Sequence, residues 1–334
     1  MTTAITTYQY PRKTLRFAAV LAATIVAALA ASASPAAPGA TPTAPVATAG
    51  RTTVVSASQL RLVRTSVSSG RRTWSYDWPV KPFDRQHPVR AFLDDPRISD
   101  TGAKAFHFGI DIAVPDGTPV YAVEAGTVWF DNAQAIAVVA RDRSHSFGYW
   151  HVVPAVKSHQ TVARHQLIAH VAKGWGHVHF AECRGTTYVN PLRNGGVGPY
   201  TDHTAPTVDK VEVYGSSLAV IAHDTPDPRV PGTWANEPVT PALLRWRTVP
   251  GTGPAQAWQT AADFRFGMLD KGDFSKVFTP ETCQNHEGKP GRFSFYLART
   301  WHAAGAVTVQ VEVSDTAGNL AVYTARLSGA DIRL

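Results

Sequence analysis

The segment Phe106–Asp111 reads FHFGID, and Ile112–Ala122 continues it as IAVPDGTPVYA. His107 and Asp111 stand four residues apart with Gly109 between them, so one short piece of backbone carries an imidazole and a carboxylate. Both groups are ordinary ligands of Zn²⁺. Two such ligands hold a metal poorly, and we therefore expect the chain to supply a third.

A second segment, Gly176–Phe180, reads GHVHF and offers that third ligand. In a strand, residues two apart point to the same face, so His177 and His179 would share one side. A His-x-His pair alone is a weak signal, because it occurs in unrelated zinc sites and in ordinary strands. The two segments in this order, with Asn190–Leu192 (NPL) just beyond, are far more specific.

Taken together, these motifs resemble those of the lysostaphin/LytM-type zinc endopeptidases, which cut the peptide part of peptidoglycan. The resemblance covers roughly residues 78–193 and includes Gly117–Val120, Gly126–Val128 and Tyr149–Val152. The last of these reads YWHV and is similar to the family's Tyr-x-His-Leu. The resemblance implies an antiparallel β-sheet peptidase domain.

The resemblance also implies a role for each of five side chains. His107, Asp111 and His179 match the zinc ligands, and His151 and His177 match the catalytic imidazoles. Two histidines and one carboxylate would leave the fourth position of a tetrahedral Zn²⁺ open, as catalytic sites require. A water activated there would attack a peptide carbonyl, with the two imidazoles moving protons or stabilising the oxyanion.

Two departures from the family pattern concern the neighbourhood of His-x-His. The loop before it is short, Ala172–Gly176, where the family usually has a longer Gly/Ser/Thr-rich loop. A Glu commonly follows His-x-His-Phe directly, whereas here Ala181 precedes Glu182. The resemblance therefore does not determine the shape of the substrate cleft.

The N-terminus has the pattern of a secretory signal peptide. Three basic residues precede the apolar run Phe17–Ala31, and the small residues Ala31–Ala33 follow it. We expect residues 1–33 to be removed, leaving an extracellular, cell-wall-associated protein without stable membrane insertion. An uncleaved membrane anchor is the alternative.

The charge of the chain is mildly positive. Without residues 1–33, which hold three basic residues and no acidic residue, the formal charge falls from +7 to +4. Such a bias favours contact with an anionic cell wall but is no nucleic-acid signature. The partner that the family resemblance implies is the peptide of bacterial peptidoglycan, and the sequence indicates no oligomeric state.

The 334 residues exceed what one hydrophobic core usually serves. Short apolar runs separated by Gly and Pro predict strands throughout, so we expect an all-β protein. The predicted divisions are a signal peptide at 1–33, an Ala/Pro/Thr-rich linker and loosely attached lead-in at 34–72, a LytM-type peptidase domain at 73–200 and a second β domain at 204–334.

The second half has the pattern of a β-sandwich. Val307, Val309, Val311 and Val313 alternate with polar residues, and Asp315–Asn319 has turn chemistry. With the Thr-Ala-Pro that opens this half, the Asp-x-Ala-Gly-Asn motif resembles bacterial immunoglobulin-like domains. The middle of this half is long and irregular for such a domain.

The two cysteines, Cys183 and Cys283, allow either a bridge between the domains or two free thiols. Among the other histidines, the following match no motif and are expected to be surface or satisfied core residues: His145, His159, His165, His170, His203, His223, His286 and His302.

The leading hypothesis is a secreted zinc endopeptidase that hydrolyses peptidoglycan cross-links. One alternative is a non-catalytic cell-wall-binding protein or hydrolase activator on the same fold. Another is an exported zinc peptidase that acts on a protein substrate.

Overall fold

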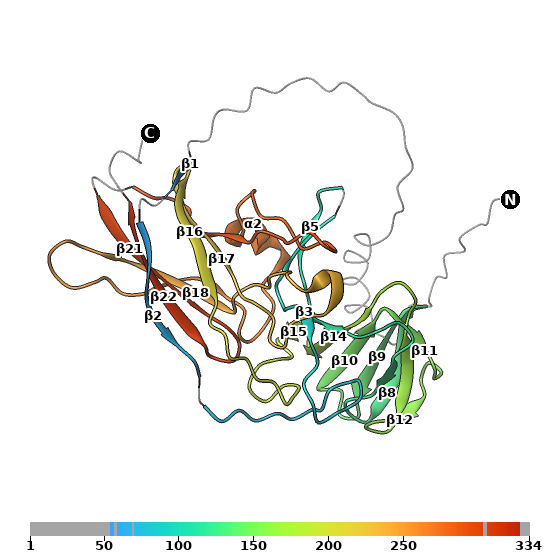
Figure 1. Ribbon diagram of the computed structural model, residues 1–334. Coiled ribbons are helices and arrows are strands. Elements are labelled where there is room, and N and C mark those ends of the chain that lie inside the picture. The colour runs from blue at the N-terminus through green and yellow to red at the C-terminus, as the bar shows by residue number, and fades with distance from the viewer. Residues whose placement is uncertain (1–53, 57–58, 69, 100, 303–305, 328–334) are drawn as a thin grey trace, which may run out of the picture.

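The computed structural model describes residues 54–56, 59–68, 70–99, 101–302 and 306–327 (Figure 1). The predicted signal peptide at 1–33 and the Ala/Pro/Thr-rich linker lie outside the described residues. Within the described part of the chain, no helix is both long and apolar enough to cross a membrane.

The first domain is built on an eight-stranded antiparallel sheet. Its spatial order is β12-β8-β9-β10-β14-β6-β3, with β15 also paired to β14. The strands are β3 (Val89–Ala91), β6 (Ile110–Ala113), β8 (Gly126–Asn132), β9 (Ala135–Ala140), β10 (His145–Trp150), β12 (Thr161–Val162), β14 (His177–Arg184) and β15 (Thr187–Val189).

Two smaller antiparallel sheets complete this domain. A three-stranded sheet has the order β11-β13-β7, and β4 pairs with β5 in a hairpin. Their strands are β4 (Pro96–Ile98), β5 (Lys104–Phe106), β7 (Pro119–Tyr121), β11 (Val152–Pro154) and β13 (Leu167–Val171). Large side chains with no exposed surface, among them Trp78 and Tyr149, fill the core between the sheets.

The second domain is a sandwich of two antiparallel sheets around one core. The four-stranded sheet has the order β1-β16-β17-β20 and the five-stranded sheet the order β19-β18-β21-β22-β2. The strands are β1 (Val54–Ser56), β2 (Gln59–Ser66), β16 (Thr207–Tyr214), β17 (Ser217–His223), β18 (Leu243–Val249), β19 (Gln259–Asp263), β20 (Ser294–Ala298), β21 (Val307–Ser314) and β22 (Leu320–Leu327).

The structure confirms the all-β class and the predicted strand alternation in the second half. Val309, Val311 and Val313 on β21 are fully buried in the sandwich core. The irregular middle contains β18 and β19, two 3₁₀ turns, η2 (Gly232–Trp234) and η3 (Lys271–Asp273), and the short helix α2 (Phe274–Val277). An immunoglobulin-like topology for this sandwich stays a prediction. Cys183 is buried, Cys283 is exposed, and both thiols are free.

The lead-in is not loosely attached, in contrast to the sequence-based expectation. β2 pairs antiparallel with β22 from Gln59↔Arg326 to Ser66↔Leu320, and β1 pairs with β16. Figure 1 shows this N-terminal strand along the edge of the second domain. The reason is that β22 would otherwise expose an unpaired row of backbone groups, which β2 satisfies.

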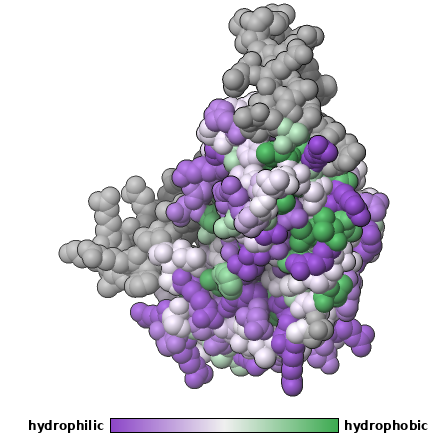
Figure 2. Space-filling model, turned by 90° about the vertical axis from the view of Figure 1, so that its left-hand side faces the viewer, coloured by the Kyte–Doolittle hydropathy of each residue, from purple (hydrophilic) through white to green (hydrophobic). Residues whose placement is uncertain are grey.

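Three exposed apolar residues lie on or just after β2: Leu62, Val63 and Val67. Figure 2 views the molecule from the side of this sheet and shows small apolar patches set among polar residues. The surface on this side is therefore mixed in character.

The cores of the two domains interlock. Phe106, at the end of β5, packs in the sandwich core and lies 5.3 Å from Phe274 between ring centroids. In the opposite direction, Val239 packs in the core of the first domain. Figure 1 shows the β4–β5 hairpin reaching from the first domain towards α2. The predicted boundary at 200–204 therefore separates sheets but not independent cores.

We predict that Phe106→Ala destabilises the whole chain by about 3–5 kcal/mol, the usual loss for a buried Phe. Its ring is 5% exposed and bridges the two domains. Urea unfolding would measure the loss, and Phe130→Ala, at a Phe that is 40% exposed, is the control. Equal stability of the two variants would contradict the shared core.

Candidate active site

Sheet register brings the two histidine motifs together. β14 pairs antiparallel with β6 so that His179 lies opposite Asp111 and His177 lies opposite Ala113. His107 precedes β6 by a short turn. Two segments more than sixty residues apart in sequence therefore present their polar side chains at one place.

His107, Asp111 and His179 form a compact buried cluster. His107 Nε2 lies 3.1 Å from Asp111 Oδ1 and 2.8 Å from His179 Nδ1. His179 Nδ1 lies 3.0 Å from the same Oδ1. The three side chains are between 3% and 7% exposed. One ligand atom from each residue thus converges on a single point.

The chemistry of this cluster fits a zinc ion. His107 Nδ1 donates to the Phe92 carbonyl oxygen at 2.7 Å, which leaves the Nε2 lone pair directed at the cluster. Ligand atoms around a tetrahedral Zn²⁺ lie about 3.3 Å apart, given metal–ligand bonds of about 2.0–2.1 Å. Two nitrogens and one oxygen at slightly shorter separations would need only a small outward shift to hold the ion.

The other two predicted histidines lie beside the cluster. His177 Nε2 is 3.6 Å from Asp111 Oδ1, and its Nδ1 is 2.7 Å from the Trp175 carbonyl oxygen. His151 stacks on the Trp175 ring at 3.6 Å between centroids and lies 4.6 Å from the His177 ring. The structure therefore brings all five predicted residues to one site.

Burial keeps the imidazoles neutral near pH 7. It lowers the pKa of His177 and of His179 to about 4 and that of His151 to about 2, and it lowers the pKa of His107 as well. Burial alone would raise the pKa of Asp111, but His107 and His177 and its hydrogen bonds hold that pKa well below the usual range. Neutral imidazoles beside a carboxylate are the protonation states that metal binding requires.

Comparison with known proteins bears on this part of the chain. The model of Peptidase family M23 matches residues 105–191, a segment that holds all five site residues. This segment belongs to peptidase family M23. Among curated proteins, none matches the chain.

The chain also matches solved structures, all at low overall similarity. Csd3 of Helicobacter pylori is 18% identical, with 42% of this chain and 43% of Csd3 covered at a TM-score of 0.29. The catalytic domain of lysostaphin from Staphylococcus simulans is 19% identical, with 38% of this chain and 90% of that domain covered at a TM-score of 0.24. LytU is 26% identical, with 31% of this chain and 79% of LytU covered at a TM-score of 0.26.

The short loop of this M23 domain is held by an acidic residue. Asp116 accepts hydrogen bonds from the backbone N–H of Gly174 at 2.6 Å and of Gly176 at 2.8 Å. The loop thereby presents the Trp175 ring to His151 and the Trp175 carbonyl to His177. The short loop is therefore compatible with an ordered site.

Two arginines that belong to no recognised sequence motif lie next to the site residues. Arg97 Nη2 lies 3.1 Å from Asp111 Oδ2, which leaves Oδ1 as the oxygen that faces the histidines. Arg90 Nη2 lies 2.6 Å from His177 Nδ1, and its guanidinium lies 4.2 Å from the ring centroid of Trp234. Because Trp234 belongs to η2 of the second domain, that domain reaches the edge of the M23 site.

Several of the remaining histidines are paired with carboxylates away from this site, as expected for satisfied residues. His145 pairs with Glu124, His165 with Asp77, and His203 with Asp227.

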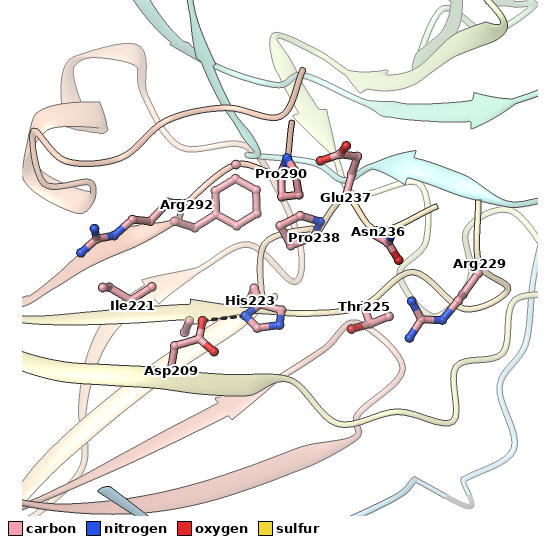
Figure 3. Close-up of a pocket in the computed structure, with 13 residues that line it drawn as sticks. Asp209, Ile221, His223, Thr225, Arg229, Asn236, Glu237, Pro238, Pro290 and Arg292 are labelled. Carbon is pink, nitrogen blue, oxygen red and sulfur yellow. Dashed lines mark hydrogen bonds and ion pairs between the residues drawn. The ribbon is translucent and has the colours of Figure 1, made fainter. Parts of the chain in front are cut away.

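A separate cavity of about 290 Å³ lies in the second domain (Figure 3). Its lining includes His223, whose Nδ1 lies 2.8 Å from Asp209 Oδ2, and Figure 3 shows Arg292 and Arg229 on opposite sides of this pair. No residue of the histidine cluster lines this cavity. It is therefore distinct from the M23 site.

We predict that Arg90→Gln raises the pKa of His177. Burial is the largest cause of the low pKa, and the Arg90 cation lowers it further by opposing a second positive charge. An NMR titration of the His177 Cε1–H in metal-free protein would show the rise. Arg229→Gln, at an exposed arginine of the second domain, is the control. An unchanged pKa in Arg90→Gln would contradict the contact.

Proposed function

We propose that this protein is a secreted zinc-dependent endopeptidase that hydrolyses peptide cross-links of bacterial peptidoglycan. The observation that carries the proposal is the convergence of three ligand atoms, from His107, Asp111 and His179, beside two neutral imidazoles. The family M23 match and the lysostaphin/LytM-like motifs support the reaction and the substrate class.

His107 Nε2, Asp111 Oδ1 and His179 Nδ1 would hold the zinc ion. When bound, zinc supplies a Lewis acid that lowers the pKa of water and polarises the scissile carbonyl. The protein contributes the orientation of these ligands. Phe92 fixes the tautomer of His107, and Arg97 fixes the carboxylate of Asp111.

His177 is suited to accept and return a proton at Nε2. When Nδ1 donates to the Trp175 carbonyl, Nε2 carries a lone pair and can act as a base. After it takes a proton at Nε2, the cationic imidazole keeps its Nδ1–H on the Trp175 carbonyl and can return the Nε2 proton as an acid. The Trp175 contact therefore fits both proton states of a general acid–base, whereas the Arg90 contact fits only the neutral tautomer with its proton on Nε2.

His151 would support the same step from the other side of His177. Its ring is stacked on Trp175, which restricts the orientation of the imidazole, and its backbone adopts a φ of 63°. Holding a polar ring in a set orientation is what stabilisation of a developing oxyanion requires. We assign His151 and His177 as the catalytic pair.

The deciding experiment incubates the purified chain without its first 33 residues with intact peptidoglycan, with and without a chelator. Mass spectrometry would identify the fragments. Release of cross-link peptides only without chelator supports the proposal. Binding to peptidoglycan without any product, from zinc-loaded protein, would favour the non-catalytic wall-binding alternative. Cleavage of a protein substrate but not of peptidoglycan would favour the exported protein peptidase.

We predict that His107→Ala and Asp111→Ala each remove zinc and activity together, because two remaining ligands hold the ion poorly. Elemental analysis by mass spectrometry would give the zinc content per chain. His145→Ala, at a histidine paired with Glu124 outside the cluster, should keep its zinc. Full zinc occupancy in either cluster variant would refute the ligand assignment.

We predict a different result for His151→Ala and His177→Ala. Each leaves the three ligands in place, so zinc should remain bound while the cleavage rate falls by about 10²–10⁴-fold. Zinc content and rate should be measured on the same preparations. A variant that loses its zinc, or one that cleaves at the wild-type rate, would show that the residue is not in the catalytic pair.

A further inference from the structure

Three acidic side chains form a buried group that is separate from the histidine cluster. Asp202, Asp224 and Asp315 are 4%, 1% and 2% exposed. One carboxylate oxygen from each lies within 4.8 Å of the others. Asp202 follows the first domain, Asp224 follows β17, and Asp315 begins the turn between β21 and β22, so three distant segments meet here.

Hydrogen bonds orient two of these carboxylates but do not neutralise them. Asp202 Oδ1 accepts from the backbone N–H and the hydroxyl of Thr204, both at 2.9 Å. Asp315 Oδ1 accepts from the backbone N–H of Gly318 at 2.6 Å and of Asn319 at 2.8 Å. All these donors are neutral, so none of them brings a positive charge to the carboxylates.

The Asp224 carboxylate has an oxygen left without a partner. Its Oδ1 accepts from the Thr225 N–H at 2.8 Å, whereas its buried Oδ2 has no hydrogen-bond partner. Within the part of the chain that the structure describes, no basic side chain forms an ion pair with any of the three carboxylates. The nearby Arg72 instead donates to the carbonyl oxygens of Thr316 and Leu192.

Three clustered, buried carboxylates are strongly unfavourable in their charged form, because desolvation and mutual repulsion both oppose it and raise the pKa of each. A divalent cation with a preference for oxygen removes both penalties. Ca²⁺ binds six to eight oxygens at about 2.3–2.6 Å, so oxygens on opposite sides of one ion lie about 4.6–5.2 Å apart. Three carboxylate oxygens within 4.8 Å of one another therefore fit inside one coordination shell.

We propose that Asp202, Asp224 and Asp315 bind one Ca²⁺ ion. The site contains only oxygen ligands, which distinguishes it from the histidine-rich cluster proposed for zinc. Asn319 links this site to neighbouring segments. Its Nδ2 donates to the Asp202 carbonyl oxygen at 2.9 Å, and its Oδ1 accepts from the Ser68 N–H at 2.8 Å. The ion would thus fasten the end of the first domain and the strand β2 to the sandwich.

The test uses the full chain without its first 33 residues, loaded with zinc and freed of other cations. Calcium chloride is then added while the unfolding midpoint is followed by circular dichroism. At a Ca²⁺ concentration about 100-fold above Kd, the midpoint should rise by about 5 °C. Calorimetric titration with calcium chloride should show one site per chain. An unchanged midpoint would overturn the proposal.

Asp224→Asn separates calcium binding from a merely structural role. This variant keeps the shape of the side chain but removes one charge and one ligand. Without Ca²⁺ its midpoint should equal or exceed that of the wild type, and calcium chloride should no longer raise it. Asp209→Asn, at a half-exposed aspartate of the same domain outside the cluster, should respond as the wild type does. An Asp224→Asn protein that is less stable without Ca²⁺ and still responds like the wild type would overturn the assignment.

Discussion

The close approach of Gly109 to β14 is the constraint on which the M23 site depends. A methyl group at this position would lie 2.3 Å from the Phe180 carbonyl oxygen and 2.9 Å from His179 Nε2. Both distances are shorter than atoms tolerate, so only glycine allows the backbone between His107 and Asp111 to pass over the strand. That passage places both residues against His179. The antiparallel register of β6 and β14 sets His179 opposite Asp111.

The same stretch of backbone ties the site to the second domain. Neighbouring residues of an extended chain point in opposite directions, and here Phe106 enters the sandwich core while His107 enters the histidine cluster. Arg90 makes a second link, since it contacts His177 on one side and Trp234 on the other. The second domain is therefore part of the environment of the site, although its sequence shows no peptidase motif.

Much of the fold could be predicted from the sequence because its signals are local. The run Ala135–Ala140 is apolar throughout and forms β9 with those bounds, and the Gly and Asn of Asp315–Asn319 favour the turn that the structure contains. The five site residues could be named because their spacing in short motifs is itself the family signal. Neither the pairing of β2 with β22 nor the position of Arg90 has such a signal, because both depend on register between distant segments.

The class of the fold, the histidines and carboxylate that come together, and the turns between strands follow from the sequence. These properties depend on side-chain chemistry and on periods of a few residues. The sequence does not show that the lead-in completes the second domain, that Phe106 joins the two cores, or that Asp202, Asp224 and Asp315 share one buried space. These contacts join segments without a common local pattern, such as Asp224 and Asp315 more than ninety residues later, and the packing of whole sheets brings them together.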